Sequence, residues 1–269
     1  MQTNTKMITK RRLGIAGIAA AALLVLILGI VFLARGFGGG SDEEADMPRD
    51  YAYGTVVADN GMELHYLRAH PSNIGLAIVH NNVAAAPYYG INGGFFYQAA
   101  LLSIAVVNDV PVNGQPGQYG SGAANAKYAR GTLVWDGALG RFSVQVVRRA
   151  TEIEVTDRSR FWAQGGISMS LDRGETWAEQ AAAEAAPLAD QDCLRSAAVY
   201  DGEGNLYLVV SATKGTLAAF REAIVGNIGD GKLVNGVFLD GDGSSQLRSR
   251  EAKLSGDGRQ VVQMITLLK

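Results

Sequence analysis

The segment 237–247, VFLDGDGSSQL, combines residue types that can take part in hydrolytic chemistry. A short apolar run leads to Asp240 and Asp242, each followed by glycine, and then to Ser244 and Ser245. This order predicts a buried strand that ends in a carboxylate, followed by a loop whose glycines expose backbone N–H groups. Such a carboxylate is suited to assisting a nucleophilic attack, and the two acids together are suited to a divalent cation. Taken alone, the motif also fits an ordinary Asp-Gly turn.

Three other segments place glycine and polar residues at one end of an apolar run: 88–96, 163–168 and 214–216. The third stands where a helix is expected to begin, and the N-terminus of a helix is suited to an anion. We therefore expect backbone N–H groups from separate loops to contribute to one anion-binding site.

Short apolar runs must position these loops, and they predict mainly strands. The sequence 201–205, DGEGN, lies between two of them and predicts a hairpin. Two helices are expected, over 176–186 and over 216–228, the second with Thr216 as its N-cap. The fold class is therefore α+β, with curved, mixed or antiparallel sheets and a few helices. The expected strands are 54–57, 62–68, 73–79, 132–135, 142–147, 196–200, 206–210 and 261–268.

Residues 13–34 form an uncharged apolar run that would span about 33 Å as a helix, enough to cross a bilayer. Basic residues precede the run and acidic residues follow it, so the N-terminus is expected in the cytoplasm. We predict a cytoplasmic tail (1–12), a transmembrane anchor (13–34), a flexible linker (35–50) and an extracytoplasmic domain (51–269). The protein would thus be a single-pass protein of the cell membrane, although a cleaved signal peptide is the alternative interpretation.

Composition excludes several classes of protein. The chain has 269 residues, of which 48% are apolar, so it is not a disordered chain. With 24 Lys and Arg against 26 Asp and Glu, its net charge of −2 argues against nucleic acid as a partner. Cys193 is the single cysteine, which excludes an intramolecular disulfide, and we expect it to be a small buried residue.

The motifs Asn92–Phe96 (NGGFF) and Leu239–Ser245 (LDGDGSS) together resemble the phosphodiester glycosidase family, whose pattern has N-G-G-F-F early and D-G-G-G-S-S late. Between them the family has an arginine before a hairpin and then a glycine at a helix start. Arg195, the hairpin 196–210 and Gly215 with Thr216 match that order and spacing. The resemblance covers residues 75–268. Its departure is the aspartate at position 242, where the family pattern usually has glycine.

The resemblance implies hydrolysis of a glycosyl phosphodiester, in which an oxocarbenium-like sugar and a departing phosphate must be stabilised. With it we assign Asp240 as nucleophile or base, Asp242 as a second carboxylate and Asn92 as a further catalytic side chain. Arg195 is assigned to phosphate, which a guanidinium binds bidentately. The other residues assigned to substrate binding are Gly93, Gly94, Gly241, Gly243, Ser244, Ser245, Gly215, Thr216 and Gln164.

The function expected from these assignments is cleavage of the glycosidic C–O bond of a sugar-1-phosphodiester in wall or extracellular glycopolymers. No cofactor is expected, although Asp240 and Asp242 leave a divalent cation open. Two other functions stay open: a non-catalytic glycopolymer-binding module, and a metal-dependent phosphodiesterase that cleaves P–O.

Overall fold

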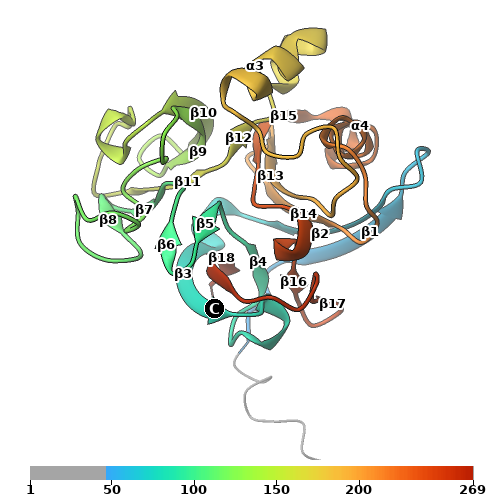
Figure 1. Ribbon diagram of the computed structural model, residues 1–269, viewed down its shortest axis with the longest axis horizontal. Helices are drawn as coiled ribbons and strands as arrows, with labels where there is room; N and C mark the ends of the chain where they lie inside the picture. The colour runs from blue at the N-terminus through green and yellow to red at the C-terminus, as the bar shows by residue number, and fades with distance from the viewer. Residues whose placement is uncertain (1–46, 269) are drawn as a thin grey trace, which may run out of the picture. The chain divides into compact units, whose positions relative to one another are not determined.

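The alternation of short apolar runs with glycine-rich turns gives a fold dominated by antiparallel sheets (Figure 1). The computed structural model describes residues 47–268, and residues 48–269 form one unit of the chain. The predicted tail (1–12), the transmembrane anchor (13–34) and most of the linker lie outside the described residues. Within 47–268, no helix has both the length and the apolar character needed to cross a bilayer.

The largest sheet has six strands in the order β1-β2-β14-β13-β15-β12, and α4 packs against it. Its hairpin β13–β14 is the one that the sequence predicted, and both strands are buried along their whole length. Asp201 fixes the turn, because its carboxylate accepts hydrogen bonds from the N–H groups of Glu203 and Asn205. The strands are β1 (Ala52–Val57), β2 (Glu63–Ala69), β12 (Ile167–Ser168), β13 (Ser196–Asp201), β14 (Leu206–Ser211) and β15 (Leu233–Phe238).

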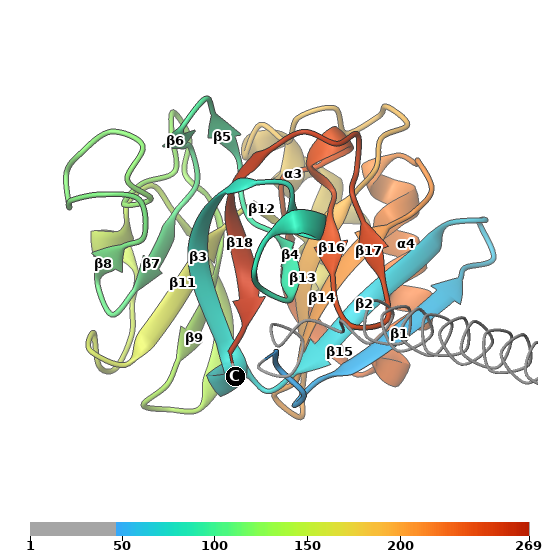
Figure 2. The ribbon, with the colours of Figure 1, turned by 90° about the horizontal axis from the view of Figure 1, so that it is seen from below.

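The other two large sheets have five strands each. One has the order β10-β9-β11-β7-β8, and the other has the order β17-β16-β4-β18-β3, in which β18 lies between β4 and β3 (Figure 2). The first contains β7 (Ala105–Val107), β8 (Val110–Pro111), β9 (Arg130–Asp136), β10 (Arg141–Val147) and β11 (Phe161–Gly165). The second contains β3 (Ile74–Asn81), β4 (Gly90–Asn92), β16 (Leu247–Arg248), β17 (Lys253–Leu254) and β18 (Val261–Leu267), and a small hairpin joins β5 (Phe96–Tyr97) to β6 (Ala100–Leu101).

Two α-helices are described, α3 (Trp177–Ala183) and α4 (Leu217–Asn227). In α4 the apolar positions predicted from helical spacing are buried, and the Thr216 hydroxyl caps the helix by accepting the N–H of Ala219 at 3.1 Å. The predicted helix over 176–186 is shorter, because Ala185 adopts left-handed backbone with φ +54°. Short 3₁₀ turns cover Pro71–Asn73, Val83–Ala85, Ala150–Glu152, Leu171–Thr176, Gly229–Gly231 and Asp242–Ser244.

The α+β fold class predicted from the sequence is confirmed, and every strand pairing recorded within 47–268 is antiparallel. All eight expected strands are present with small shifts of their ends. The strands that the sequence did not indicate are short, between two and five residues, and some of them pair with strands far away in the chain, as β4 does with β16 and β18 and β11 does with β7.

Candidate functional site

A pocket of about 170 Å³ lies beyond the end of β15, beside the beginning of β13. Apolar side chains form much of its wall, among them Phe95, Ile167, Leu217 and Phe238. Its charged residues are Arg195, Asp240, Asp242 and Arg259, two acids and two guanidinium groups. Segments that are far apart in the sequence therefore meet at one hollow with a balanced set of charges.

Asp240 follows the buried end of β15, as the sequence predicted. The backbone around it is held on both sides, because Leu239 N–H donates to the Ser196 carbonyl at 2.9 Å and the Asp240 carbonyl accepts from Asn92 Nδ2 at 2.8 Å. Burial raises the pKa of Asp240 to about 6, while hydrogen bonds from the Ser244 hydroxyl and the Gly241 N–H, and the charge of Arg259, act in the opposite direction. The carboxylate thus exchanges its proton near neutral pH, a property suited to an acid or base.

Asn92 contacts the backbone of the Asp240 loop and does not line the pocket. Its side chain is 1% exposed, and its Oδ1 accepts hydrogen bonds from Ser196 Oγ at 2.8 Å and from Gln246 N at 3.1 Å. Its Nδ2 donates to the carbonyls of Asp240 and Gly93. Both polar atoms of the amide are thus engaged within the protein, and Asn92 is not among the residues that line the pocket.

Arg195 is buried at the pocket wall, where burial lowers the pKa of its guanidinium. Nη2 donates to the carbonyls of Leu188 and Gln191 at 2.7 and 2.6 Å, and Nε donates to the Gly215 carbonyl at 3.0 Å. Nη1 makes no hydrogen bond among residues 47–268. The guanidinium is therefore fixed by three carbonyls through Nε and Nη2, which leaves Nη1 without a protein acceptor among the described residues.

Asp242 occupies left-handed backbone, with φ +54°, a conformation that favours glycine and tolerates aspartate. This backbone requirement explains why glycine suits the position in the pattern. The side chain is 46% exposed, and its Oδ2 lies 3.6 Å from Nη2 of Arg259.

Arg259, which no sequence motif indicated, precedes β18 and lines the pocket. Its Nε also donates to both carboxylate oxygens of Asp257, at 2.9 and 3.0 Å. The feature of the sequence that could have indicated Arg259 is the basic residue itself, which stands just before the long apolar run of β18. Gln246 was missed as well, and its side chain links the Val83 N–H to the carbonyls of Gly243 and Arg259.

The predicted anion nest of glycine N–H groups is not formed as expected. The N–H groups of Gly93 and Gly94 donate to the backbone and side chain of Gln263, and the Gly241 N–H bonds the Asp240 carboxylate. At Gly243, an added Cβ would lie 2.1 Å from Asp257 Oδ2. These glycines mainly allow close packing of backbone against neighbouring groups.

Three other residues predicted to contact the substrate, Gly215, Thr216 and Gln164, make hydrogen bonds within the protein. The Gly215 N–H donates to the Cys193 carbonyl at 2.9 Å, and Thr216 is used as the helix cap. Gln164 is fully buried in a polar pair with Gln263, whose Nε2 donates to Gln164 Oε1 at 2.9 Å. Ser245 is buried, and its Oγ has no hydrogen-bond partner among the described residues. Of the predicted binding residues, Arg195 and Gly241 line the pocket, and Ser244 bonds the Asp240 carboxylate.

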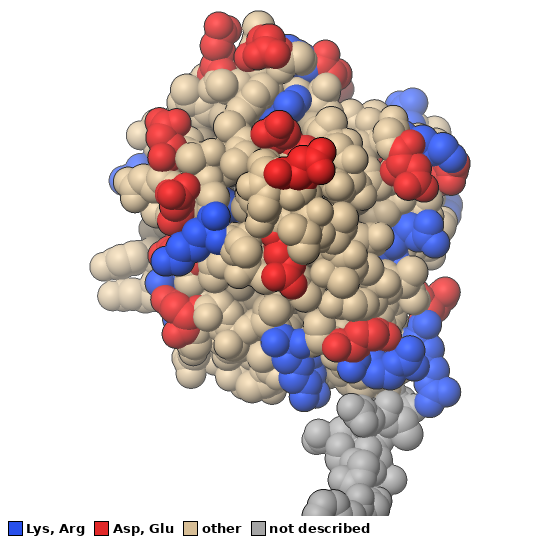
Figure 3. Space-filling model, turned by 90° about the vertical axis from the view of Figure 1, so that its right-hand side faces the viewer, with Lys and Arg blue, Asp and Glu red and all other residues tan. Residues whose placement is uncertain are grey.

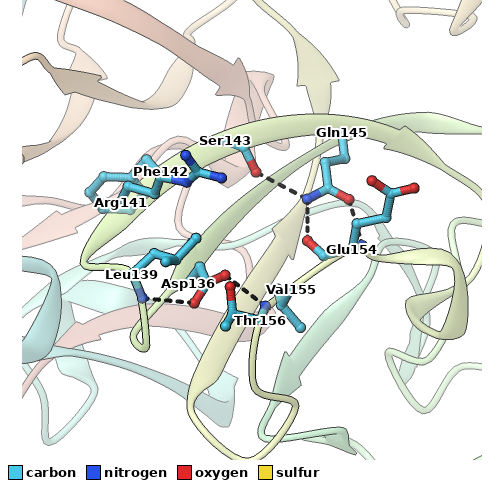
Figure 4. A pocket seen from close by; sticks show the side chains of 9 residues that line it. All are labelled: Asp136, Leu139, Arg141, Phe142, Ser143, Gln145, Glu154, Val155 and Thr156. Carbon is cyan, nitrogen blue, oxygen red and sulfur yellow. Dashed lines mark hydrogen bonds between the residues drawn. The ribbon is translucent and has the colours of Figure 1, made fainter.

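A second polar hollow, beside β9 and β10, is lined by two acids, Asp136 and Glu154 (Figure 4). The carboxylate of Asp136 accepts the N–H groups of Ala138, Leu139 and Thr156 at 2.8–3.1 Å. Burial alone would raise the pKa of Asp136, but these hydrogen bonds outweigh burial and lower it. Asp136 is therefore held as a structural carboxylate in an Asp-Gly turn.

A divalent cation has weak support at Asp240 and Asp242. Within 47–268, no group of three or more His, Cys, Asp or Glu side chains gathers as a metal site. Arg259 stands beside Asp242 and supplies positive charge at the place that a cation would take. The arrangement of charges favours an anionic ligand between the two arginines over a metal ion between the two acids.

Comparison with known proteins gives a likeness of fold. No family profile and no curated protein sequence matches the chain. Among solved structures, the chain is similar to the catalytic domain of zebrafish N-acetylglucosamine-1-phosphodiester alpha-N-acetylglucosaminidase, auto-inhibited by its pro-peptide. The TM-score is 0.56 with 14% identity, over 86% of this chain and 85% of that one. A hypothetical protein from Synechocystis gives a TM-score of 0.55 with 13% identity, over 80% of this chain and 61% of that one. These identities establish a distant resemblance of fold.

Proposed function

We propose that the protein is a hydrolase that cleaves the glycosidic C–O bond of a sugar-1-phosphodiester, as a divergent relative of the phosphodiester glycosidases. The observation that carries the proposal is the Asp240 carboxylate, with a pKa of about 6, in one pocket with Arg195 and Arg259. The fold likeness to an enzyme domain named for this chemistry supports it.

In the proposed reaction the phosphodiester lies between the two arginines and the sugar lies against the apolar wall. Arg195 Nη1 and Arg259 stabilise the phosphate as it departs with the bonding electrons. Asp240, ionised above about pH 6, attacks the anomeric carbon or removes a proton from the attacking water. Asn92 and Ser196 hold the backbone of the Asp240 loop so that the carboxylate keeps its direction.

The test is hydrolysis of a small synthetic sugar-1-phosphodiester by the full chain in water labelled with ¹⁸O. Cleavage at C–O places the label in the sugar, whereas cleavage at P–O places it in the phosphate. We expect label in the sugar, unaffected by EDTA, and loss of turnover in Asp240→Asn with turnover retained in Asp136→Asn. Label in the phosphate together with inhibition by EDTA would instead establish the metal-dependent phosphodiesterase, and binding of the diester with no product would establish the binding module.

The location proposed from residues 13–34 is the cell membrane, with the domain 51–269 on its outer side and the tail 1–12 in the cytoplasm. The substrates there would be sugar phosphates of wall or extracellular glycopolymers. Protease added to intact cells is expected to digest the domain and to leave the tail protected. Protection of the domain would contradict this orientation.

A further inference from the structure

A third hollow carries aromatic and basic side chains beside the loop 112–128. This aromatic-basic groove has a volume of about 740 Å³ and no acidic residue in its lining. Tyr97, Tyr119 and Tyr128 are 64%, 76% and 45% exposed. The hollow continues along the same loop, because an adjoining one of about 420 Å³ shares Tyr119 and Arg149 with it. The groove is defined by Tyr97, Tyr119, Lys127, Tyr128, Arg148 and Arg149.

The charge of the aromatic-basic groove differs from that of the protein as a whole. Lys127, Arg130, Arg148 and Arg149 all line it, although the chain carries a net charge of −2. On the face shown in Figure 3, acidic and basic side chains are interspersed. A concentration of cations with no acid among the lining residues indicates an anionic ligand.

The groove is already formed by backbone hydrogen bonds. The Leu101 N–H donates to the Gly120 carbonyl at 2.9 Å, and the Ala126 N–H donates to the Leu102 carbonyl at 2.8 Å. Lys127 has left-handed backbone, φ +67°, which costs conformational energy in a residue other than glycine. A ligand that binds here therefore meets a largely ordered surface, which lowers the entropic cost of binding.

The groove and the Asp240 pocket share a wall. Phe95 lines the pocket, while its neighbour Phe96 lines the groove. Arg130 lies between them, with its guanidinium 4.9 Å from the Phe95 ring centre and 5.6 Å from that of Tyr128. It also donates to the carbonyl of Ala185, just before residues that line the pocket. The two hollows are therefore neighbours on either side of Phe95, Phe96 and Arg130, and a chain-like ligand that occupied both would pass over this wall.

We propose that the aromatic-basic groove binds the remainder of an anionic glycan whose sugar-1-phosphodiester lies at Asp240. This proposal rests on the proposed function and specifies its substrate as a charged polymer. The exposed tyrosine rings stack on the apolar faces of sugar rings. The lysine and arginines contact phosphates or carboxylates spaced along the chain. Nucleic acid carries similar charges, but the shared wall with a sugar-phosphate site favours a glycan.

The test measures binding by the full chain in the Asp240→Asn background, so that no ligand is consumed. The probes are a phosphomannan with sugar-1-phosphodiester groups, a neutral dextran of equal length and a single-stranded oligodeoxynucleotide. We expect salt-sensitive binding of the phosphomannan, and about tenfold or greater weakening in the double variant Tyr119→Ala, Arg148→Gln. The matched control Tyr88→Ala, Lys253→Gln changes exposed residues that do not line the groove and is expected to bind normally.

Kinetics with Asp240 intact separate this proposal from the proposed function. The groove variant is expected to lose about tenfold in kcat/KM on the phosphomannan and to retain kcat/KM on the small sugar-1-phosphodiester. Equal loss on both substrates, unaltered binding of the phosphomannan, or tighter binding of dextran or oligonucleotide would overturn the groove assignment. Groove-dependent binding without hydrolysis of either substrate would overturn the proposed function and leave the groove assignment in place.

Discussion

Asp136 and Asp240 form a natural comparison, because each is followed by glycine near the end of a strand, and each borders a hollow. Asp136 accepts three backbone N–H groups, and its pKa is lowered despite burial. Asp240 has the Ser244 hydroxyl and a single backbone N–H, and burial raises its pKa to about 6. The same dipeptide thus holds a carboxylate with a lowered pKa at one place and one with a raised pKa at the other.

The carboxylate of Asp240 is more deeply enclosed by the protein than that of Asp136 and has fewer donors, and both differences raise its pKa relative to that of Asp136. Each N–H that donates to a carboxylate stabilises the charged form and lowers its pKa. A carboxylate with a pKa near neutrality therefore needs few such donors. At Asp240 the loop is instead fixed through its backbone carbonyl by Asn92, so the side chain stays free of strong stabilisation. Asn92 thereby fixes the backbone of Asp240, while burial and the donors to its carboxylate set its pKa.

The largest expected effect is on turnover. Asp240→Asn removes the nucleophile or base and is expected to lower kcat/KM on a sugar-1-phosphodiester by about 10³-fold. Asp136→Asn, the matched change in the other turn, is expected to stay within about twofold. Steady-state kinetics at pH 7.5 measure both, and equal losses in the two variants would remove the distinction between them.

Stability is expected to change in opposite directions in the same two variants. Burial of ionised Asp240 destabilises the fold above its folded pKa, so Asp240→Asn should raise the free energy of unfolding by about 2–3 kcal/mol at pH 7.5. The gain should disappear as pH falls from about 6 to about 4, where the unfolded carboxyl is also protonated. Urea unfolding at several pH values tests this, and a variant less stable than the parent at pH 7.5 would contradict it.

Asp136→Asn should instead lower the free energy of unfolding by about 1–3 kcal/mol, because an amide cannot accept all the N–H groups now directed at the carboxylate. Since the folded pKa of Asp136 is depressed, its contribution is present above the unfolded pKa and is lost as pH falls through the folded value. The same urea series measures the loss, and a change below experimental error would show that these bonds are replaceable.

The activity of the parent protein should follow the ionisation of Asp240. If the carboxylate must be charged, kcat/KM rises with pH up to about 6 and then levels, with a tenfold fall per pH unit below that point. A pH profile on the small diester measures this acidic limb, the part of the profile in which kcat/KM rises with pH. A limb near pH 4, the range of an ordinary aspartate, would show that Asp240 is not the titrating group.

The smallest expected effect is a shift in the pH at which the acidic limb of the kcat/KM profile levels off. Arg259 lowers the pKa of Asp240 by its charge, so Arg259→Gln should move the limb toward higher pH. The pH profile of the variant tests this, with Lys232→Gln as a control at an exposed cation that does not line the pocket. A limb moved toward lower pH would contradict the assigned electrostatics.

The sequence predicted the parts of the molecule that local pattern determines. The hairpin 196–210, the cap at Thr216 and the strand leading to Asp240 all follow from neighbouring residues. The roles of Asn92 and Arg259 depend on which distant segments meet, so no local pattern reveals them. Glycine likewise signals close approach without showing what approaches, and at Gly93 the neighbour is Gln263 and not an anion.

The position of β18 has a consequence for the order in which the protein can fold. This strand is the last in the described chain, yet it lies in the interior of its sheet, where Met264 pairs with Asn92 of β4. Until it arrives, β3 and β4 each expose an unpaired edge, and Asn92 lacks its strand partner Met264. A chain in which residues 261–267 have not yet paired should therefore be prone to aggregation through these edges, and pairing over such sequence separations favours slow folding.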